Sequence, residues 1–118
     1  MVKVKEIMKK NVITADPNLT MADIAKIMTN NRVGSVVVMK DDRPVGIVTD
    51  SDVVTVIANG KSPSDVKIKD VPKRRKGFVS AAPGESVTAV TKKMIKNGVK
   101  RIPIIENGKL LGMVSDKE

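Results

Sequence analysis

The sequence has no cysteine, histidine, tryptophan or tyrosine, and its single aromatic residue is Phe78. Without cysteine, no disulfide framework can form. With histidine also absent, the usual ligand sets for zinc, iron and copper are missing, so we expect no metal site. Catalysis would depend on carboxylates, lysines or activated hydroxyls, and the spacing shows no paired-carboxylate or Ser-Lys arrangement. These absences favour a binding module over an enzyme, with no catalytic residue and no catalytic cofactor.

Two kinds of targeting segment are also missing. There is no apolar stretch of 18 residues, and no leader with a basic start, an apolar middle and a small-residue cleavage site. We therefore expect a cytoplasmic protein with no membrane partner. The 118 residues, 41% of them apolar, suffice for one small domain or two half-domains that share an aliphatic core. Phe78 either fills that core or packs beneath a ligand.

The net charge of +9 is concentrated in one segment. Residues 61–76 contain seven lysines and arginines against two aspartates, which accounts for +5 of the total. A run of this kind is typical of a solvated linker. The alternative is contact with a phosphate-rich partner, either the polyphosphate of a small ligand or a nucleic acid.

The chain contains an internal repeat. Residues 12–52 superpose on residues 78–118 without a gap at an offset of 66, so that Pro17 matches Pro83 and Gly46 matches Gly112. Upstream, "VKEIM" (4–8) recurs as "IKDVP" (68–72) at an offset of 64. We therefore divide the chain into a first repeat (1–60), a basic connecting segment (61–77) and a second repeat (78–118).

Each repeat is predicted to run strand, helix, strand, strand, helix, which gives an α/β (α+β) fold. Helical apolar spacing follows Thr20 and Ser86, the expected N-caps. The predicted strands are residues 12–14, 36–39 and 45–48 in the first repeat and 78–80, 102–105 and 110–114 in the second. A final helix follows Asp52, whereas the second repeat stops at Glu118 without one. We expect this helix to be truncated, or its apolar neighbours to be covered by a partner chain.

A tandem repeat of this length with "VKEIM", "GIVTDSD" (46–52) and "KRIPII" (100–105) resembles a CBS domain pair, or Bateman module, of the stand-alone kind. The resemblance implies two repeats related by a pseudo-twofold axis, with clefts between them that bind AMP, ADP, ATP or S-adenosylmethionine. It also implies assembly into a homodimer and regulation of a partner protein.

The motif Gly-apolar-x-Thr/Ser-x-x-Asp/Asn of that family is met by "GIVTDSD". By resemblance, Asp52 accepts hydrogen bonds from the ribose hydroxyls, Thr49 and Ser51 contact phosphate, and Ile47 lines the cleft. The chemistry is reasonable by itself, since a carboxylate suits a vicinal diol and a helix start favours anions. The alternative is that Thr49 and Asp52 form only a capping box.

The resemblance places a second wall opposite Asp52. This wall, together with Ile47, Thr49, Ser51 and Asp52, is called the Asp52 site below. Arg101 holds the position from which the family often supplies a basic side chain to phosphate, a role suited to its forked, permanently charged guanidinium. The wall consists of Val79, Ser80, Ala81, Lys100, Arg101, Ile102 and Pro103.

A second, weaker site is implied around the end of the other repeat, and is called the Glu118 site. It comprises Ile13, Thr14, Ala15, Ser35, Val36, Met113, Ser115 and Glu118. Glu118 stands where the family has Asp, and Gly34 and Ser35 replace the basic pair Lys100 and Arg101. We therefore predict one competent nucleotide site and one impaired or differently selective site.

The sequence thus predicts a regulatory module that senses an adenosine-containing nucleotide and catalyses no reaction. One alternative is a nucleic-acid-binding protein that uses the basic surface, although the aromatic residues that stack on bases are absent. The other is an accessory fragment of a purine-nucleotide enzyme, since related pairs are inserted in inosine monophosphate dehydrogenase.

Overall fold

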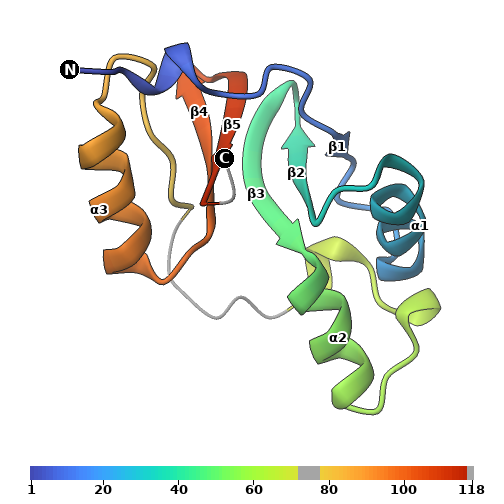
Figure 1. Cartoon of the computed structure of the whole chain (residues 1–118). Helices are drawn as coiled ribbons and strands as arrows, with labels where there is room; N and C mark the ends of the chain where they lie inside the picture. The colour runs from blue at the N-terminus through green and yellow to red at the C-terminus, as the bar shows by residue number, and fades with distance from the viewer. Residues whose placement is uncertain (72–77, 117–118) are drawn as a thin grey trace. The chain divides into compact units, whose positions relative to one another are not determined.

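The computed structural model describes residues 1–71 and 78–116, which form two compact units (Figure 1). The first-repeat unit contains residues from Ile13 onward through the first repeat and the described part of the connecting segment. The second-repeat unit combines Met1–Val12 with the residues that follow Phe78. Each unit has its own hydrophobic cluster.

The first-repeat unit is a three-stranded sheet with two helices. Strands β1 (Thr14–Ala15), β2 (Ser35–Lys40) and β3 (Arg43–Thr49) lie in the order β1-β2-β3, with β1 parallel and β3 antiparallel to β2. Helix α1 (Met21–Asn31) connects β1 to β2, and α2 (Asp50–Ala58) continues directly from β3 (Figure 1). The core consists of Ala15, Met21, Ile24, Met28, Val36, Val38, Val48, Val56 and Ile68.

The second-repeat unit repeats this plan with fewer elements. The antiparallel hairpin of β4 (Arg101–Glu106) and β5 (Lys109–Ser115) lies with α3 (Val87–Asn97) and the 3-10 turn η1 (Val4–Glu6). Its core consists of Val4, Ala81, Val90, Met94, Ile102, Ile104 and Val114. The described part of this unit contains no strand formed by residues 78–80, and a single parallel bridge joins Ala81 to Ile104.

The predicted helices and hairpin strands are confirmed, but the predicted first strands are wrong: β1 covers Thr14–Ala15 instead of residues 12–14, and residues 78–80 form no strand. Pairing begins at Thr14 in β1, and in the second repeat only Ala81 pairs. The apolar pattern does not determine which backbone groups pair. The Ser80 carbonyl instead accepts a hydrogen bond from Lys93 Nζ at 3.0 Å, which takes it out of a strand ladder.

The predicted N-caps are also confirmed. Thr20 Oγ1 accepts a hydrogen bond from the Asp23 backbone N–H at 3.1 Å, and Ser86 Oγ accepts one from Ala89 N–H at 3.1 Å. In α1 the Asp23 carboxylate completes a capping box by accepting from the Thr20 N–H at 3.0 Å. These bonds satisfy donors that every helix start leaves without an intrahelical acceptor.

The two hairpins turn in the same way with different residues. Asn107 and Gly108 have φ values of 51° and 77°, as the Asn-Gly hairpin signal predicts. At the equivalent positions of the first repeat, Asp41 and Asp42 adopt φ values of 51° and 62°. The first hairpin therefore holds a non-glycine residue in a left-handed conformation where the second has glycine.

The leading segments of the two repeats are exchanged. The Val4 N–H donates to the Glu85 carbonyl at 2.9 Å, and the equivalent Ile68 N–H donates to the Leu19 carbonyl at 2.9 Å. Val4 is fully buried in the second-repeat unit, and Ile68 is buried in the first-repeat unit. Boundaries drawn along the sequence do not show this exchange. The segment around Val4 precedes the first repeat but packs with the second, and the segment around Ile68 precedes the second repeat but packs with the first.

Candidate functional site

The first half of the Asp52 site lies where β3 ends and α2 begins. Thr49 is the last residue of β3, opposite Ser35 in the register of the sheet, and Asp52 is in the first turn of α2. Asp52 Oδ2 accepts a hydrogen bond from the Thr49 backbone N–H at 2.8 Å and lies 3.4 Å from Thr49 Oγ1. The two residues therefore form a capping box at the start of α2, in which the Asp52 carboxylate accepts from the N-cap amide.

Capping leaves part of this carboxylate available. Both contacts to Thr49 use Oδ2, and Asp52 Oδ1 makes no hydrogen bond to any residue in the described part of the chain. The side chains of Thr49 and Asp52 are half-buried, so solvent still reaches them. A carboxylate held by one oxygen at a helix start can accept a hydrogen bond from a diol with the other.

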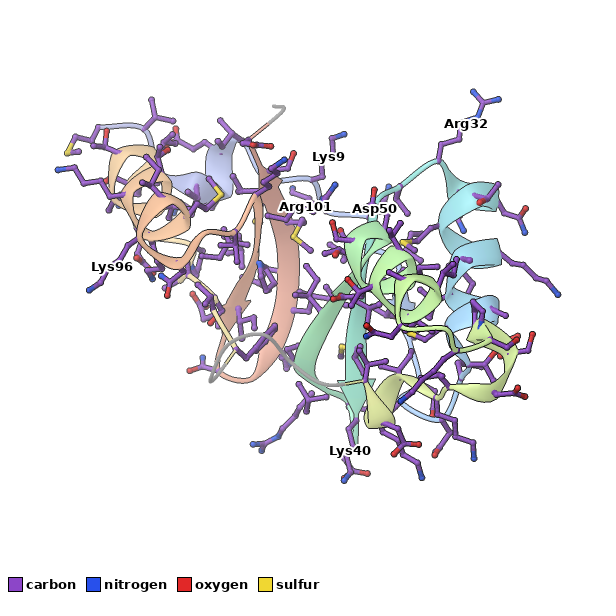
Figure 2. All side chains as sticks on the ribbon, turned by 90° about the horizontal axis from the view of Figure 1, so that it is seen from below. Lys9, Arg32, Lys40, Asp50, Lys96 and Arg101 are labelled. Carbon is purple, nitrogen blue, oxygen red and sulfur yellow. The ribbon has the colours of Figure 1, made fainter. Side chains whose placement is uncertain are left out.

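Ile47 precedes this pair in β3, and Ser51 lies between its two members in the first turn of α2. Ile47 is half-buried in β3, opposite Val37, and Ser51 is exposed in the first turn of α2. The Ser51 N–H donates to Asp50 Oδ1 at 2.9 Å, and the Asp50 N–H donates to the Gly34 carbonyl at 3.1 Å. Figure 2 labels Asp50 on α2. The first-repeat unit thus brings together all four residues that it was predicted to supply to this site.

The second half of the Asp52 site belongs to the second-repeat unit. The Ala81 N–H donates to the Pro103 carbonyl at 3.1 Å, and the Ala81 carbonyl accepts from Ile105 N–H at 2.9 Å. The Ser80 carbonyl accepts a hydrogen bond from Lys93 Nζ. Ser80 and Ala81, two of the three residues predicted to offer backbone groups to a ligand, therefore already form hydrogen bonds within the unit. Val79 makes no backbone hydrogen bond to a described residue, so it keeps groups that could pair with a purine edge.

The start of β4 supplies the other predicted contacts. Ile102 and Pro103 are fully buried and offer no accessible surface to a ligand, whereas Lys100 is exposed and Arg101 half-buried. Arg101 pairs in register with Ser115 of β5. Arg101 therefore shares a unit with Ser115, a residue of the other predicted site, while Thr49 belongs to the first-repeat unit.

The residues of the Glu118 site are divided in the same way. In the first-repeat unit, Ala15 and Val36 are buried, Thr14 is exposed, and Ile13 and Ser35 are half-buried. In the second-repeat unit, Ser115 is half-buried at the end of β5. Glu118 lies outside the described residues.

Met113 pairs with the N-terminal segment, which the sequence analysis did not predict. The Met113 N–H and carbonyl both bond to Lys9 at 2.9 Å, so the N-terminal segment lies along β5. A Cβ at Gly112 would lie 2.7 Å from Met8 Sδ and 2.8 Å from the Lys9 carbonyl. The repeated glycine in "GMVSDKE" is therefore needed for close approach of this segment, a role that the sequence alone did not indicate.

The sequence also missed an ion pair beside Ser80. Lys93 Nζ lies 3.0 Å from Glu85 Oε1, and the Ala82 N–H donates to Glu85 Oε2 at 2.6 Å. Partial burial raises the pKa of Glu85, but the Ala82 amide and Lys93 outweigh it and together lower that pKa below its usual value. At the equivalent positions the first repeat has Leu19 and Ile27, and this difference is the signal that could have revealed the pair.

Within residues 1–71 and 78–116, no three potential metal-ligating His, Cys, Asp or Glu residues cluster together. None of the helices in this part of the chain is long and apolar enough to span a membrane.

The CBS domain family model matches residues 4–59 and 68–118, so the chain belongs to the CBS domain family. An uncharacterized protein of Methanopyrus kandleri is 35% identical over 97% of this chain, which spans 59% of that protein's length. An uncharacterized 17.7 kDa protein of Acidianus ambivalens is 37% identical over 98% of the chain, which covers 70% of its length.

Solved structures share the fold. A CBS domain pair in complex with 5′-methylthioadenosine and S-adenosyl-L-methionine superposes with a TM-score of 0.88 at 25% identity, covering 99% of this chain and 91% of its own. A hexameric CBS-CP12 protein from bloom-forming cyanobacteria superposes with a TM-score of 0.87 at 28% identity, covering 99% of this chain and 68% of its own. The chain is therefore a CBS pair of mixed α and β structure.

Proposed function

We propose that this CBS pair is a regulatory module that binds an adenosine-containing ligand through the Asp52 site and catalyses no reaction. The observation that carries the proposal is the Asp52 carboxylate, fixed by Thr49 through one oxygen with the other free of described partners. The related pair solved with two adenosine-containing ligands supports the ligand class. The candidate ligands are AMP, ADP, ATP and S-adenosylmethionine.

The mechanism follows from linkage. A ligand that binds one conformation of the module better than another shifts the population toward that conformation, and a partner protein that recognises it responds. The ligand's differential affinity sets the largest possible shift. The second-repeat residues Val79 and Arg101 are proposed to complete the contacts to the base and the phosphate.

The proposal is tested by calorimetry and thermal unfolding with AMP, ADP, ATP and S-adenosylmethionine, using the wild type and Asp52→Asn. A true ligand at a hundred times its dissociation constant stabilises the fold by about 2.7 kcal/mol. Asp52→Asn is expected to remove most of that stabilisation, because the amide replaces one acceptor of the ribose diol with a donor.

A matched control separates capping from ligand binding. Asp23 has the same capping role at the start of α1 that Asp52 has in α2. Both Asp→Asn variants lose a cap contact, at a cost of about 1 kcal/mol or less without ligand, but only Asp52→Asn should lose the ligand response. Equal ligand responses in the two variants, or no response to any of the four ligands in the wild type, would contradict the proposal.

We also propose that the module works as a homodimer through α2. Val54 and Ile57 lie three residues apart on α2 and are 63% and 57% exposed, which is unusual for aliphatic side chains on one helix face. Burial of that face against a second copy would remove it from water. Sedimentation of the wild type and of Val54→Glu tests this: a monomer–dimer equilibrium that the glutamate leaves unchanged would reject the α2 interface.

A further inference from the structure

Three asparagines of the chain, Asn59, Asn97 and Asn107, are followed directly by glycine. This dipeptide favours a reaction within the main chain, because glycine has no Cβ to obstruct attack of its backbone nitrogen on the asparagine side chain. The other asparagines precede valine, leucine, asparagine or arginine, whose side chains obstruct that attack. The hydrogen bonds around the three Asn-Gly pairs therefore decide which of them reacts.

The pair at residues 59–60 closes helix α2. Asn59 is the C-cap, and the Gly60 N–H donates to the Ile57 carbonyl at 3.0 Å. The Asn59 N–H donates to the Thr55 carbonyl at 3.0 Å. The nitrogen that would attack the Asn59 side chain is thus bound to the helix end, and this bond has to open before the reaction can occur.

The pair at residues 97–98 is held more firmly at the end of α3. The Gly98 N–H donates to the Ile95 carbonyl at 3.2 Å, and Asn97 Nδ2 donates to the Lys93 carbonyl at 2.8 Å. The Asn97 side chain is also half-buried. Both reacting groups are engaged, so at least two hydrogen bonds have to break before they can meet.

The pair at residues 107–108 has neither constraint. Asn107 is exposed at the tip of the β4–β5 hairpin, where φ is 51° for Asn107 and 77° for Gly108. Glu106 pairs with Lys109, so the ladder ends before the turn residues. Within residues 1–71 and 78–116, neither the Asn107 side chain nor the Gly108 N–H forms a hydrogen bond. Rotation at the tip brings the two groups together without loss of a hydrogen bond by either.

We propose that Asn107 is a site of spontaneous deamidation, which converts its side-chain amide into a carboxylate. The Gly108 nitrogen loses its proton to a base in solution and attacks Asn107 Cγ, so that an N–Cγ bond forms. The Cγ–Nδ2 bond breaks, and the amide nitrogen takes up a proton and leaves as ammonia. Water then opens the cyclic imide at one of its two carbonyls and gives aspartate or isoaspartate. The sequence requires water and base alone, with no oxidant or reductant.

The first repeat shows which product the turn accepts. Asp41 is the equivalent of Asn107 at an offset of 66, and it has the same φ of 51°. Aspartate at position 107 therefore suits the turn and adds a negative charge beside Glu106. Isoaspartate instead routes the main chain through Cβ. The extra backbone atom in a two-residue turn disrupts the pairing of Glu106 with Lys109.

The test incubates the folded full chain in mildly alkaline buffer and follows deamidation by tryptic peptide mapping with tandem mass spectrometry. Lysine or arginine residues separate the three Asn-Gly pairs, so each lies on its own peptide. Asn107 should react about fivefold faster than Asn59 and on the order of tenfold faster than Asn97, because hydrogen bonds have to open at the other two pairs. Reaction at Asn59 or Asn97 that is as fast as at Asn107 would overturn the proposal.

Two controls separate the effect of the fold from that of the dipeptide. In urea the three rates should converge to within about twofold, since no hydrogen bond then protects any pair. A ranking that persists in urea would reject the structural cause. The variant Asp41→Asn/Asp42→Gly places Asn-Gly in the first hairpin, where the new asparagine should react within about threefold of the rate at Asn107. If the new asparagine stays unmodified, the argument from the turn is refuted.

The effect on the hairpin is tested with Asn107→Asp, which reproduces one of the two products. Its urea unfolding midpoint should equal that of the wild type, because Asp41 already holds the equivalent conformation. Protein enriched in isoaspartate by incubation should unfold at a lower urea concentration. Equal midpoints for the aspartate and isoaspartate forms would refute the disruption assigned to isoaspartate, and a lower midpoint for Asn107→Asp would refute the comparison with Asp41.

Discussion

Replacement of Gly112 by alanine should destabilise the second-repeat unit because of one added methyl group. The new Cβ would lie 2.7 Å from Met8 Sδ, 2.8 Å from Met8 Cγ and 2.8 Å from the Lys9 carbonyl oxygen. The methionine end can rotate away, but Lys9 O is backbone and accepts the Met113 N–H at 2.9 Å. Relief of the contact therefore requires the N-terminal segment to move away from β5.

The magnitude follows from these contacts. Overpacking of this kind costs about 1–3 kcal/mol, and the loss of unfolded-state entropy on replacing glycine returns about 0.4–1 kcal/mol. A net loss of about 1–2 kcal/mol in unfolding free energy is expected. Gly84→Ala is the matched control, because a Cβ there meets nothing within 4 Å and should change stability by about 0.5 kcal/mol or less.

Urea unfolding followed by circular dichroism measures both variants. A double variant, Gly112→Ala with Met8→Ala, should recover the part of the lost unfolding free energy that comes from the clash with the Met8 side chain. It should not recover the part caused by the Lys9 carbonyl. If Gly112→Ala is as stable as Gly84→Ala, the N-terminal segment does not lie against β5 as described, and the exchange of leading segments is wrong.

Three further predictions concern local features. Asp42→Gly should raise the unfolding free energy in urea by about 0.5–1 kcal/mol, because φ is 62° there and Gly108 fills the equivalent position; an unchanged midpoint would contradict this. Thr20→Ala should lower the unfolding free energy by about 1 kcal/mol through loss of the α1 cap. Thr88→Ala is the control and should not produce this loss. The lowered pKa of Glu85 means that its contribution is complete above its unfolded value of 4.5 and is lost as pH falls through the folded value. At pH values below 4.5, the urea midpoint of Glu85→Gln should therefore decrease less steeply with falling pH than that of the wild type. Identical slopes in the two proteins would reject this.

The candidate sites were only partly predictable from sequence. The motif "GIVTDSD" identified Thr49 and Asp52 because their spacing fixes them at a strand end and a helix start, and local geometry then brings them together. The ion pair of Glu85 and Lys93 depends on how α3 packs beside residues 78–80. Apolar periodicity describes the buried face of a helix but not the polar contacts made along its edge.

The sequence by itself determined the repeat, the helices and their caps, and the hairpin turns, because each depends on residues within a few positions of one another. It also determined the family, through motifs that recur in both repeats. Only the tertiary structure decided that Val4 packs in the second-repeat unit and Ile68 in the first. The two segments have similar apolar patterns and would suit either hydrophobic core, so the choice depends on contacts between residues far apart in the chain, which no local pattern encodes.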